Sequence, residues 1–321
     1  MPKDSDIVIV GVGCKFPGAN NLQEYWRVLS NGENHVKEIP KDRWNIDAFY
    51  DEDADAPGKT YVRRAGFVDG IDEFDNRFYG INDEEAKLID PQQRLVLDCT
   101  QMALEDGGIT RKDIEKTNTS VYIGSMTDDY KGHVMDDNTI ASAYSVTGTH
   151  NSIISARVSY TYNLLGPALT IDTACSSSLV AIDVASQAIL AGKCKTAICG
   201  GVNVLLDPQL FIALAKARML SPDGQCKTFT NENKGYARGE GCGIVIIKKF
   251  KDALADGNKI WGMITTDTNQ DGNIAKPISA PAEEQQRNLI DQLYRNENVD
   301  RSKISLIEAH GESAIHVIAY N

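Results

Sequence analysis

Short apolar runs alternate with longer helical stretches along this chain, and this alternation restricts the possible folds more than any other feature. The runs are rich in valine, isoleucine and threonine, and several are apolar at successive positions, as strands buried on both faces are. The predicted strands are Asp6–Gly11, Ser120–Gly124, Leu169–Thr173, Thr196–Val204, Gly243–Lys248, Trp261–Thr266 and Ile304–Ala309. Helices must cover both sides of such strands, so we predict a layered α/β fold.

Local signals also indicate two helices and a boundary. Pro91–Glu105 has proline in its first turn, where the missing amide hydrogen costs nothing, and a glycine pair follows it. Lys251–Asp256, followed by Gly257, is predicted to form a short helix and a turn. We place the boundary there, which assigns 1–250 to an N-terminal half and 251–321 to part of a second half.

Composition and charge exclude several classes of protein. The 321 residues include 33 Lys and Arg against 45 Asp and Glu, a formal charge of −12, and 42% are hydrophobic. That share excludes wholesale disorder, and a pI near 4.9 argues against a basic nucleic-acid-binding surface. No apolar run approaches the roughly 18 residues of a membrane helix. The seven cysteines include no C-x-x-C pair, so we expect mostly buried free thiols, no metal and a cytoplasmic location.

The segment around Cys175 carries the clearest chemical signal. A predicted strand leads into Cys175, three serines follow, and a helix is predicted from Leu179 to about Gly192. A thiol at a strand-to-helix turn meets unpaired amides and the positive end of the helix, which favour thiolate. The same amides can donate to an oxyanion when the thiol attacks a thioester. The alternative is that Cys175 is one more small core residue.

We predict that two glycine motifs do not form nucleotide-binding sites. Gly11-Val12-Gly13 follows a strand, but Phe16 occupies the third glycine position of a dinucleotide-binding turn and Pro17 follows it. The run Gly235–Gly241 resembles a phosphate cradle, yet tight backbone packing is the more common reason for such glycines. We therefore expect no bound cofactor.

His310 is the histidine best placed for a role. It follows the predicted strand Ile304–Ala309 and precedes Gly311, so its side chain can reach a cleft at the carboxyl edge of a sheet. The alternative is a histidine that only forms a structural hydrogen bond.

At this point a resemblance becomes specific. The chain resembles the β-ketoacyl synthase domains of type I polyketide synthases and of animal fatty acid synthase, in an ordered series of motifs over residues 5–311. The motifs are Ile7–Gly18, Pro40–Trp44, Asp90–Leu95, Ala103–Asp106, Asp172–Leu179, Gly200–Asn203, Met219–Gly224, Gly235–Gly241, Asn269–Gly272 and Glu308–Gly311. The resemblance implies a thiolase-like fold of two similar α/β halves, with the helix behind Cys175 between them. It also implies a homodimer in which the strand Leu169–Thr173 pairs with its own copy.

The same resemblance implies the chemistry. Cys175 would accept an acyl chain from the phosphopantetheine thioester of an acyl carrier protein, and a decarboxylated malonyl-type extender would then attack the acyl thioester. His310 would donate a hydrogen bond to the extender's thioester carbonyl. Phe229 matches a family phenylalanine near the cysteine and would shield the extender carboxylate from water, the alternative being an ordinary core aromatic.

The resemblance breaks after Gly311. The family continues with Gly-Thr-Gly-Thr and then Gly-Asp-Pro, whereas this chain continues with Glu312 and Ser313. A catalytic lysine, a second catalytic histidine and three strands are expected to be missing, and His316 is a poor substitute because it lies on an unrelated apolar tail. We therefore expect a C-terminally truncated domain with an incomplete second half, which loads Cys175 but does not condense. The alternatives are a non-condensing decoy or scaffold and an acyltransferase that only loads.

Overall fold

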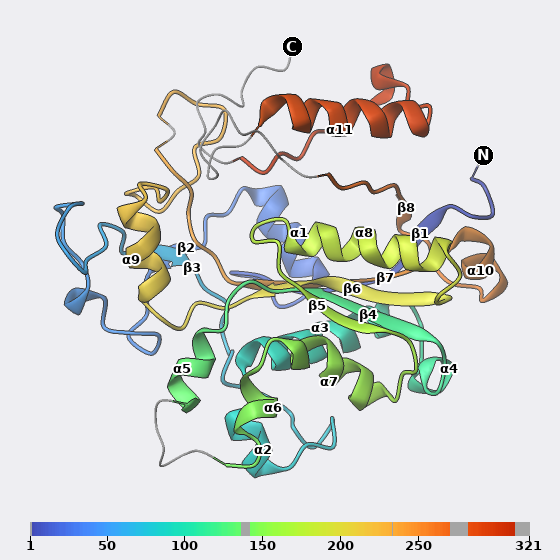
Figure 1. The fold of residues 1–321 in the computed structure, drawn as a ribbon, viewed down its shortest axis with the longest axis horizontal. Coiled ribbons are helices and arrows are strands. Elements are labelled where there is room, and N and C mark those ends of the chain that lie inside the picture. The colour runs from blue at the N-terminus through green and yellow to red at the C-terminus, as the bar shows by residue number, and fades with distance from the viewer. Residues whose placement is uncertain (1, 136–141, 233, 270–281, 312–321) are drawn as a thin grey trace.

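A six-stranded mixed sheet with the order β5-β4-β6-β7-β1-β8 forms the centre of the computed structural model (Figure 1). The structure describes residues 2–135, 142–232, 234–269 and 282–311. β4 pairs in parallel with β5 and β6, whereas β7 is antiparallel to β6 and β1, and β8 is antiparallel to β1. A separate ladder joins β2 and β3. The strands are β1 (Ile7–Lys15), β2 (Val36–Glu38), β3 (Arg64–Gly66), β4 (Thr119–Gly124), β5 (Ala168–Ile171), β6 (Thr196–Asn203), β7 (Gly241–Lys249) and β8 (Gly262–Ile264).

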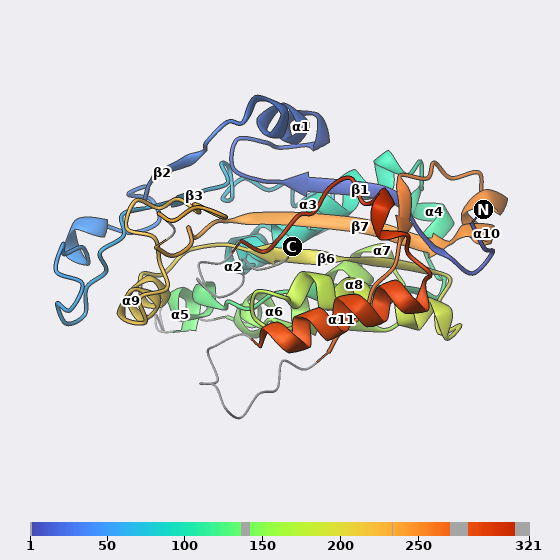
Figure 2. The same cartoon turned by 90° about the horizontal axis from the view of Figure 1, so that it is seen from above.

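Helices cover both faces of the central sheet, as predicted. α3 (Pro91–Asp106) and α7 (Ser152–Tyr162) pack on one face and α8 (Ser177–Leu190) on the other, with α11 (Glu283–Asn296) further out on the α8 side (Figures 1 and 2). The remaining helices are α1 (Leu22–Asn31), α2 (Asp83–Leu88), α4 (Arg111–Ile114), α5 (Asp129–Met135), α6 (Ser145–Thr149), α9 (Gln209–Lys216) and α10 (Phe250–Ala255), with 3₁₀ turns at Ile46–Ala48 and Arg301–Lys303. None of the helices in the described ranges has the length and apolar content to cross a membrane.

The two glycines of β1 explain how closely α3 approaches the sheet. A Cβ atom added at Gly11 would overlap the carbonyl oxygen of Ala103, and one added at Gly13 would overlap that of Cys99. The helix therefore rests directly on the strand backbone. These glycines serve helix packing, which agrees with the interpretation that they do not form a dinucleotide-binding turn.

Buried cysteines contribute to both sides of the core. The layer between the sheet and α3 includes Cys99 and Cys242, and the layer under α8 includes Cys194 and Cys199. With Cys14, these make five buried free thiols, which confirms that part of the prediction.

Two predicted strands require correction. Ile304–Ala309 has no regular secondary structure, and it lies on the surface with Leu306 79% and Ile307 76% exposed. A strand needs a neighbouring edge, and the described residues provide none for this segment. Trp261–Thr266 forms only the short β8, which extends the first sheet by pairing with β1 instead of starting a second sheet. The other predicted strands and both helices are confirmed to within a few residues at their ends; the division at residue 250 stays a prediction.

Candidate active site

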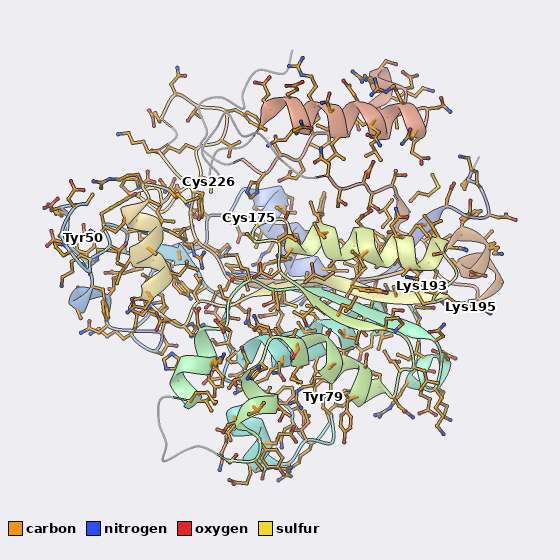
Figure 3. All side chains as sticks on the ribbon, viewed as in Figure 1. Tyr50, Tyr79, Cys175, Lys193, Lys195 and Cys226 are labelled. Carbon is orange, nitrogen blue, oxygen red and sulfur yellow. The ribbon has the colours of Figure 1, made fainter. Side chains whose placement is uncertain are left out.

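Cys175 lies on the turn between β5 and α8. β5 ends at Ile171 and α8 begins at Ser177. Within the turn, Ala174 has a φ of +57°, a left-handed conformation that costs a non-glycine residue about 1 kcal/mol. The side chain of Asp172 holds this conformation by accepting a hydrogen bond from the Ala174 amide at 2.9 Å. The turn leaves Cys175 exposed at the N-terminal end of α8 (Figure 3), so the alternative of a core cysteine is wrong.

Cys175 lines a cavity of about 480 Å³ at one edge of the central sheet. β4 and β6 end at this edge, where the antiparallel β7 begins and β1 ends. The ends of β4 and β6 lie directly against the first turn of α8, since a Cβ atom added at Gly124 or Gly201 would overlap it. The opening left by these small residues is large enough for a thioester group beside the thiol.

The second half of the glycine-rich run Gly235–Gly241, residues 238–241, lines this cavity. Gly235 has a φ of +129°, and a Cβ atom there would overlap the backbone of Leu220. Glu240 is buried and accepts two hydrogen bonds from Arg43, at 3.1 and 3.2 Å, and two more from backbone amides. The run therefore combines a tightly packed turn at Gly235 with the ion pair of Glu240, which favours the packing interpretation. The absence of a bound phosphate stays a prediction.

Arg238 is a residue of this run that sequence reasoning missed. It is only 8% exposed and lines the same cavity as Cys175. Burial lowers the pKa of its guanidinium, while Tyr236, Asp129 and Cys175 act in the opposite direction. The only sequence signal is a single cation inside a run of small residues.

The structure does not place His310 in the lining of the Cys175 cavity. His310 is exposed, and the residue after it, Gly311, accepts a hydrogen bond from the Thr228 hydroxyl at 3.2 Å. Thr228 precedes Phe229, which has a φ of +61° and is 65% exposed. Phe229 is therefore not a core aromatic, and it does not line the cavity either. His316 lies outside the described residues.

A second interaction places the His310 segment close to Tyr25. The pKa of the Tyr25 hydroxyl is raised by burial and by the nearby Cys14 and Glu308, so Glu308 lies close to Tyr25. The ring of Tyr25 lies 4.7 Å from that of Phe16, which lines the Cys175 cavity. Segment 308–311 thus runs between Tyr25 and Thr228, neither of which lines the cavity, and no regular strand carries it.

The comparison with known families shows which family the chain belongs to. Residues 4–253 match the family described as "Beta-ketoacyl synthase, N-terminal domain", and residues 263–316 match its C-terminal domain. The chain belongs to the β-ketoacyl synthase family. Its fold is accordingly the thiolase-like fold of ketosynthases.

Similar ketosynthases come from polyketide synthases. Polyketide synthase PksL of Bacillus subtilis is 37% identical over 95% of this chain, and fusarin C synthetase of Gibberella moniliformis is 41% identical over 97%. Among solved structures, an oxazolomycin ketosynthase domain of Streptomyces albus has a TM-score of 0.90 at 36% identity and covers 96% of this chain. The ketosynthase from module 6 of the bacillaene synthase of Bacillus subtilis has a TM-score of 0.85 at 37% identity, again over 96%.

The match covers only part of each relative. This ketosynthase chain spans 7% of PksL and 8% of fusarin C synthetase. It spans 53% of the oxazolomycin ketosynthase chain and 51% of the bacillaene one.

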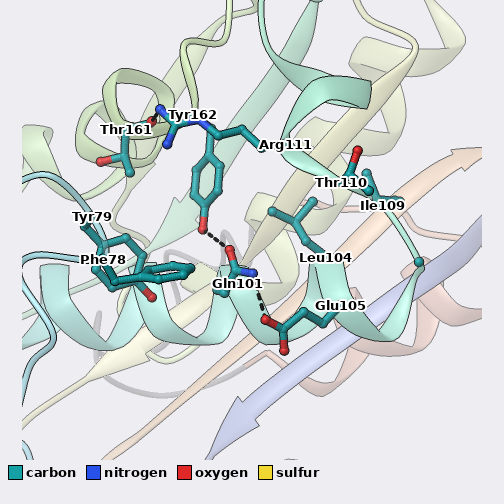
Figure 4. Close-up of a pocket in the computed structure, with 11 residues that line it drawn as sticks. Phe78, Tyr79, Gln101, Leu104, Glu105, Ile109, Thr110, Arg111, Thr161 and Tyr162 are labelled. Atoms are coloured by element: carbon teal, nitrogen blue, oxygen red, sulfur yellow. Dashed lines mark hydrogen bonds between the residues drawn. The ribbon is translucent and has the colours of Figure 1, made fainter.

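A second cavity of the ketosynthase lies on the face of the sheet that α3 and α7 cover, between these two helices (Figure 4). Its volume is about 470 Å³, and aromatic side chains such as Tyr79 and Tyr162 line it. The Tyr162 hydroxyl donates to Gln101 at 2.9 Å, and Gln101 in turn donates to Glu105 at 2.8 Å. These polar groups bond one another, so we assign the cavity no chemistry. Among the described residues, no group of three or more His, Cys, Asp and Glu side chains is arranged to hold a metal ion.

Proposed function

We propose that this domain forms carbon–carbon bonds in polyketide biosynthesis, with Cys175 as the nucleophile. The thiolate attacks the thioester of an acyl chain on an acyl carrier protein, which leaves acyl-Cys175 and the carrier's phosphopantetheine thiol. A malonyl-type extender then loses carbon dioxide, and its carbanion attacks the acyl-Cys175 carbonyl to give a β-ketoacyl carrier and regenerate the thiolate. The exposure of Cys175 at the start of α8, inside the cavity, carries this proposal.

The turn supports the first half of the reaction. The amides at the start of α8 favour negative charge at the sulfur and on the oxyanion that forms when the thioester is attacked. Among the cysteines, Cys175 combines exposure with this position, whereas five others are buried. We propose that the same amides hold the acyl-thioester carbonyl when the extender carbanion attacks.

We propose His310 as the donor to the extender's thioester carbonyl and Phe229 as a shield for its carboxylate. The contact between Gly311 and Thr228 supports this pairing because it brings the residues that adjoin His310 and Phe229 together. A neutral imidazole donates a hydrogen bond without protonating the carbanion.

We further propose that the domain works in the cytoplasm as a homodimer and receives its substrates from an acyl carrier protein. β5 is an edge strand of the sheet, with Leu169 49% exposed, so a second copy can pair with it. Polyketide synthases among the relatives favour a polyketide over a fatty acid product.

An assay that separates the two half-reactions tests the proposal. The purified chain is incubated with an acyl-carrier thioester, and intact-protein mass spectrometry reports the acyl adduct; malonyl-carrier is then added and the β-ketoacyl product is measured. We expect an adduct on the wild type and on Cys226→Ala, a matched exposed cysteine, and no adduct on Cys175→Ala. An adduct that persists in Cys175→Ala would overturn the proposal. An adduct without product would favour the loading-only alternative. The expectation that this chain loads Cys175 without condensing stays a prediction, which the second step of the assay tests.

A further inference from the structure

Arg238 is a buried cation beside Cys175 that the chemistry above does not use. It lies on the loop before β7, is 8% exposed, and lines the cavity together with Cys175. Its guanidinium lies over the ring of Phe211, with 5.7 Å from its central carbon to the ring centroid. Packing on the aromatic ring therefore fixes the charge in place instead of letting it extend into solvent.

The guanidinium of Arg238 is incompletely paired, unlike that of Arg43, which forms an ion pair with Glu240. The Nε and Nη2 atoms of Arg43 donate to Glu240 at 3.1 and 3.2 Å. The same two nitrogens of Arg238 are buried and have no hydrogen-bond partner. Buried donors without partners are costly, so such an arrangement calls for a functional reason.

The groups that face Arg238 show where its charge acts. Asp129, on α5, is partly buried and already accepts a hydrogen bond from the Leu206 amide at 3.0 Å, and burial raises its pKa. Tyr236 hydrogen-bonds to the guanidinium, and Cys175 interacts with it electrostatically. On the turn of Cys175 itself, Asp172 accepts from the Ala174 amide.

Glu240, two residues along the chain, does not compete for this charge. Both of its oxygens are occupied by Arg43 and by backbone amides. The positive charge of Arg238 therefore acts on Tyr236 and Asp129, and also on the thiol with which it shares the cavity.

We propose that Arg238 is a positioning residue that stabilises the Cys175 thiolate and gives the cavity a positive potential. A fixed cation near a thiol favours its ionised form, and a low-dielectric wall strengthens the effect. Arg238 would thus add to the contribution of the α8 N-terminus. The proposal rests on the proposed role of Cys175 as the nucleophile.

Alkylation of individual cysteines tests this directly. The rate of modification of Cys175 by neutral iodoacetamide is measured from pH 5 to pH 10 by peptide mapping, in the wild type, Arg238→Met and Arg238→Lys. We expect the midpoint of the profile to rise by about one pH unit in Arg238→Met and the rate at pH 7 to fall about three- to tenfold. Arg238→Lys, which keeps the charge, should stay close to the wild type.

An anionic reagent adds a readout that a purely structural role would not change. The ratio of iodoacetate to iodoacetamide rates at Cys175 should exceed that at the exposed Cys226 in the wild type, because the cation attracts the anion. In Arg238→Met this ratio should fall about threefold or more. Arg218→Met is the matched control, since Arg218 is an exposed cation that pairs with Asp55 and does not line the cavity.

The outcomes separate this inference from the proposed function. An unchanged pH profile and ratio in folded Arg238→Met would overturn the role of Arg238 and leave that of Cys175 intact. Equal ratios at Cys175 and Cys226 in the wild type would also overturn it, and this measurement needs no variant that folds. Failure of the acyl adduct to depend on Cys175 would instead overturn the proposed function.

Discussion

Asp90 carries a carboxyl group into the core at the start of α3. It caps the helix by accepting a hydrogen bond from the Gln92 amide at 2.7 Å, and it is 1% exposed. Burial raises its pKa to about 6, although the hydrogen bonds from Gln92 act in the opposite direction. The residue thus combines a helix cap with a carboxylate that is costly to ionise.

Replacing Asp90 by asparagine should remove a pH dependence of stability. Because the folded-state pKa is raised, its stabilising contribution is complete below pH 4 and is lost as the pH rises through about 6. We expect the wild-type free energy of unfolding to lose about 2 kcal/mol from this group between pH 4 and pH 7, whereas Asp90→Asn keeps the cap and lacks this loss. Urea unfolding at several pH values measures the difference, and parallel curves for the two proteins would contradict the expectation.

Cys175 should react with thiol reagents far faster than the buried cysteines. Burial, with the nearby Cys99, raises the pKa of Cys14 to about 11, and burial also raises that of Cys199. Cys175 is exposed beside a helix N-terminus, which has the opposite effect on a thiol. Limiting iodoacetamide at pH 8 followed by peptide mapping should label Cys175 at least about tenfold more than Cys14. Faster labelling of Cys14 in the folded protein would contradict the assignment.

At the scale of elements, the contact between β1 and α3 is set by glycine. A Cβ atom at Gly13 would overlap the backbone of Cys99, and neither element can move without disturbing the core around it. We expect Gly13→Ala to destabilise the protein by about 3 kcal/mol or more. Gly262→Ala, in β8, is the matched control because an added Cβ meets no atom within 4 Å there. Equal thermal unfolding of the two variants would show that the helix can retreat.

Asp106 connects three elements at the end of α3. Its carboxylate accepts from the Val12 amide of β1 at 3.0 Å and from the indole of Trp261, just before β8, at 2.6 Å. We expect Asp106→Ala to loosen β8 and lower stability by about 1–3 kcal/mol. Hydrogen exchange of residues 259–264 should rise at least about tenfold. Glu105→Ala, one residue earlier and exposed, should leave that exchange unchanged.

At the scale of the whole molecule, the first sheet was predictable and its surroundings were not. Apolar runs such as Ser120–Gly124 and Thr196–Val204 identify strands because burial on both faces leaves a local trace in composition. Ile304–Ala309 has the same composition but finds no partner edge among the residues that the structure describes. A partner strand is a non-local property that no window of sequence contains. Cys175 was found because a strand, a thiol and a helix adjoin along the chain. Arg238 was missed because its burial and its unpaired nitrogens arise only from packing.

The edge formed by β5 leads to the last prediction. β5 pairs only with β4 in the six-stranded sheet, so its outer backbone groups and the half-exposed Leu169 face outward. An edge strand with unpaired backbone groups and an exposed apolar side chain can pair with a strand of another chain. Two copies of β5 related by a two-fold axis would form hydrogen bonds to each other along both edges. We therefore expect the chain to sediment as a dimer at micromolar concentration.

Leu169→Lys places two like charges at such an interface and should weaken dimerisation about 100-fold or more. Leu254→Lys is the matched control, because Leu254 is 57% exposed on α10, which packs on β1 and β7 instead. Sedimentation velocity of the three proteins decides the matter: a wild type that stays monomeric, or a Leu169→Lys variant that still dimerises, would place the contact elsewhere.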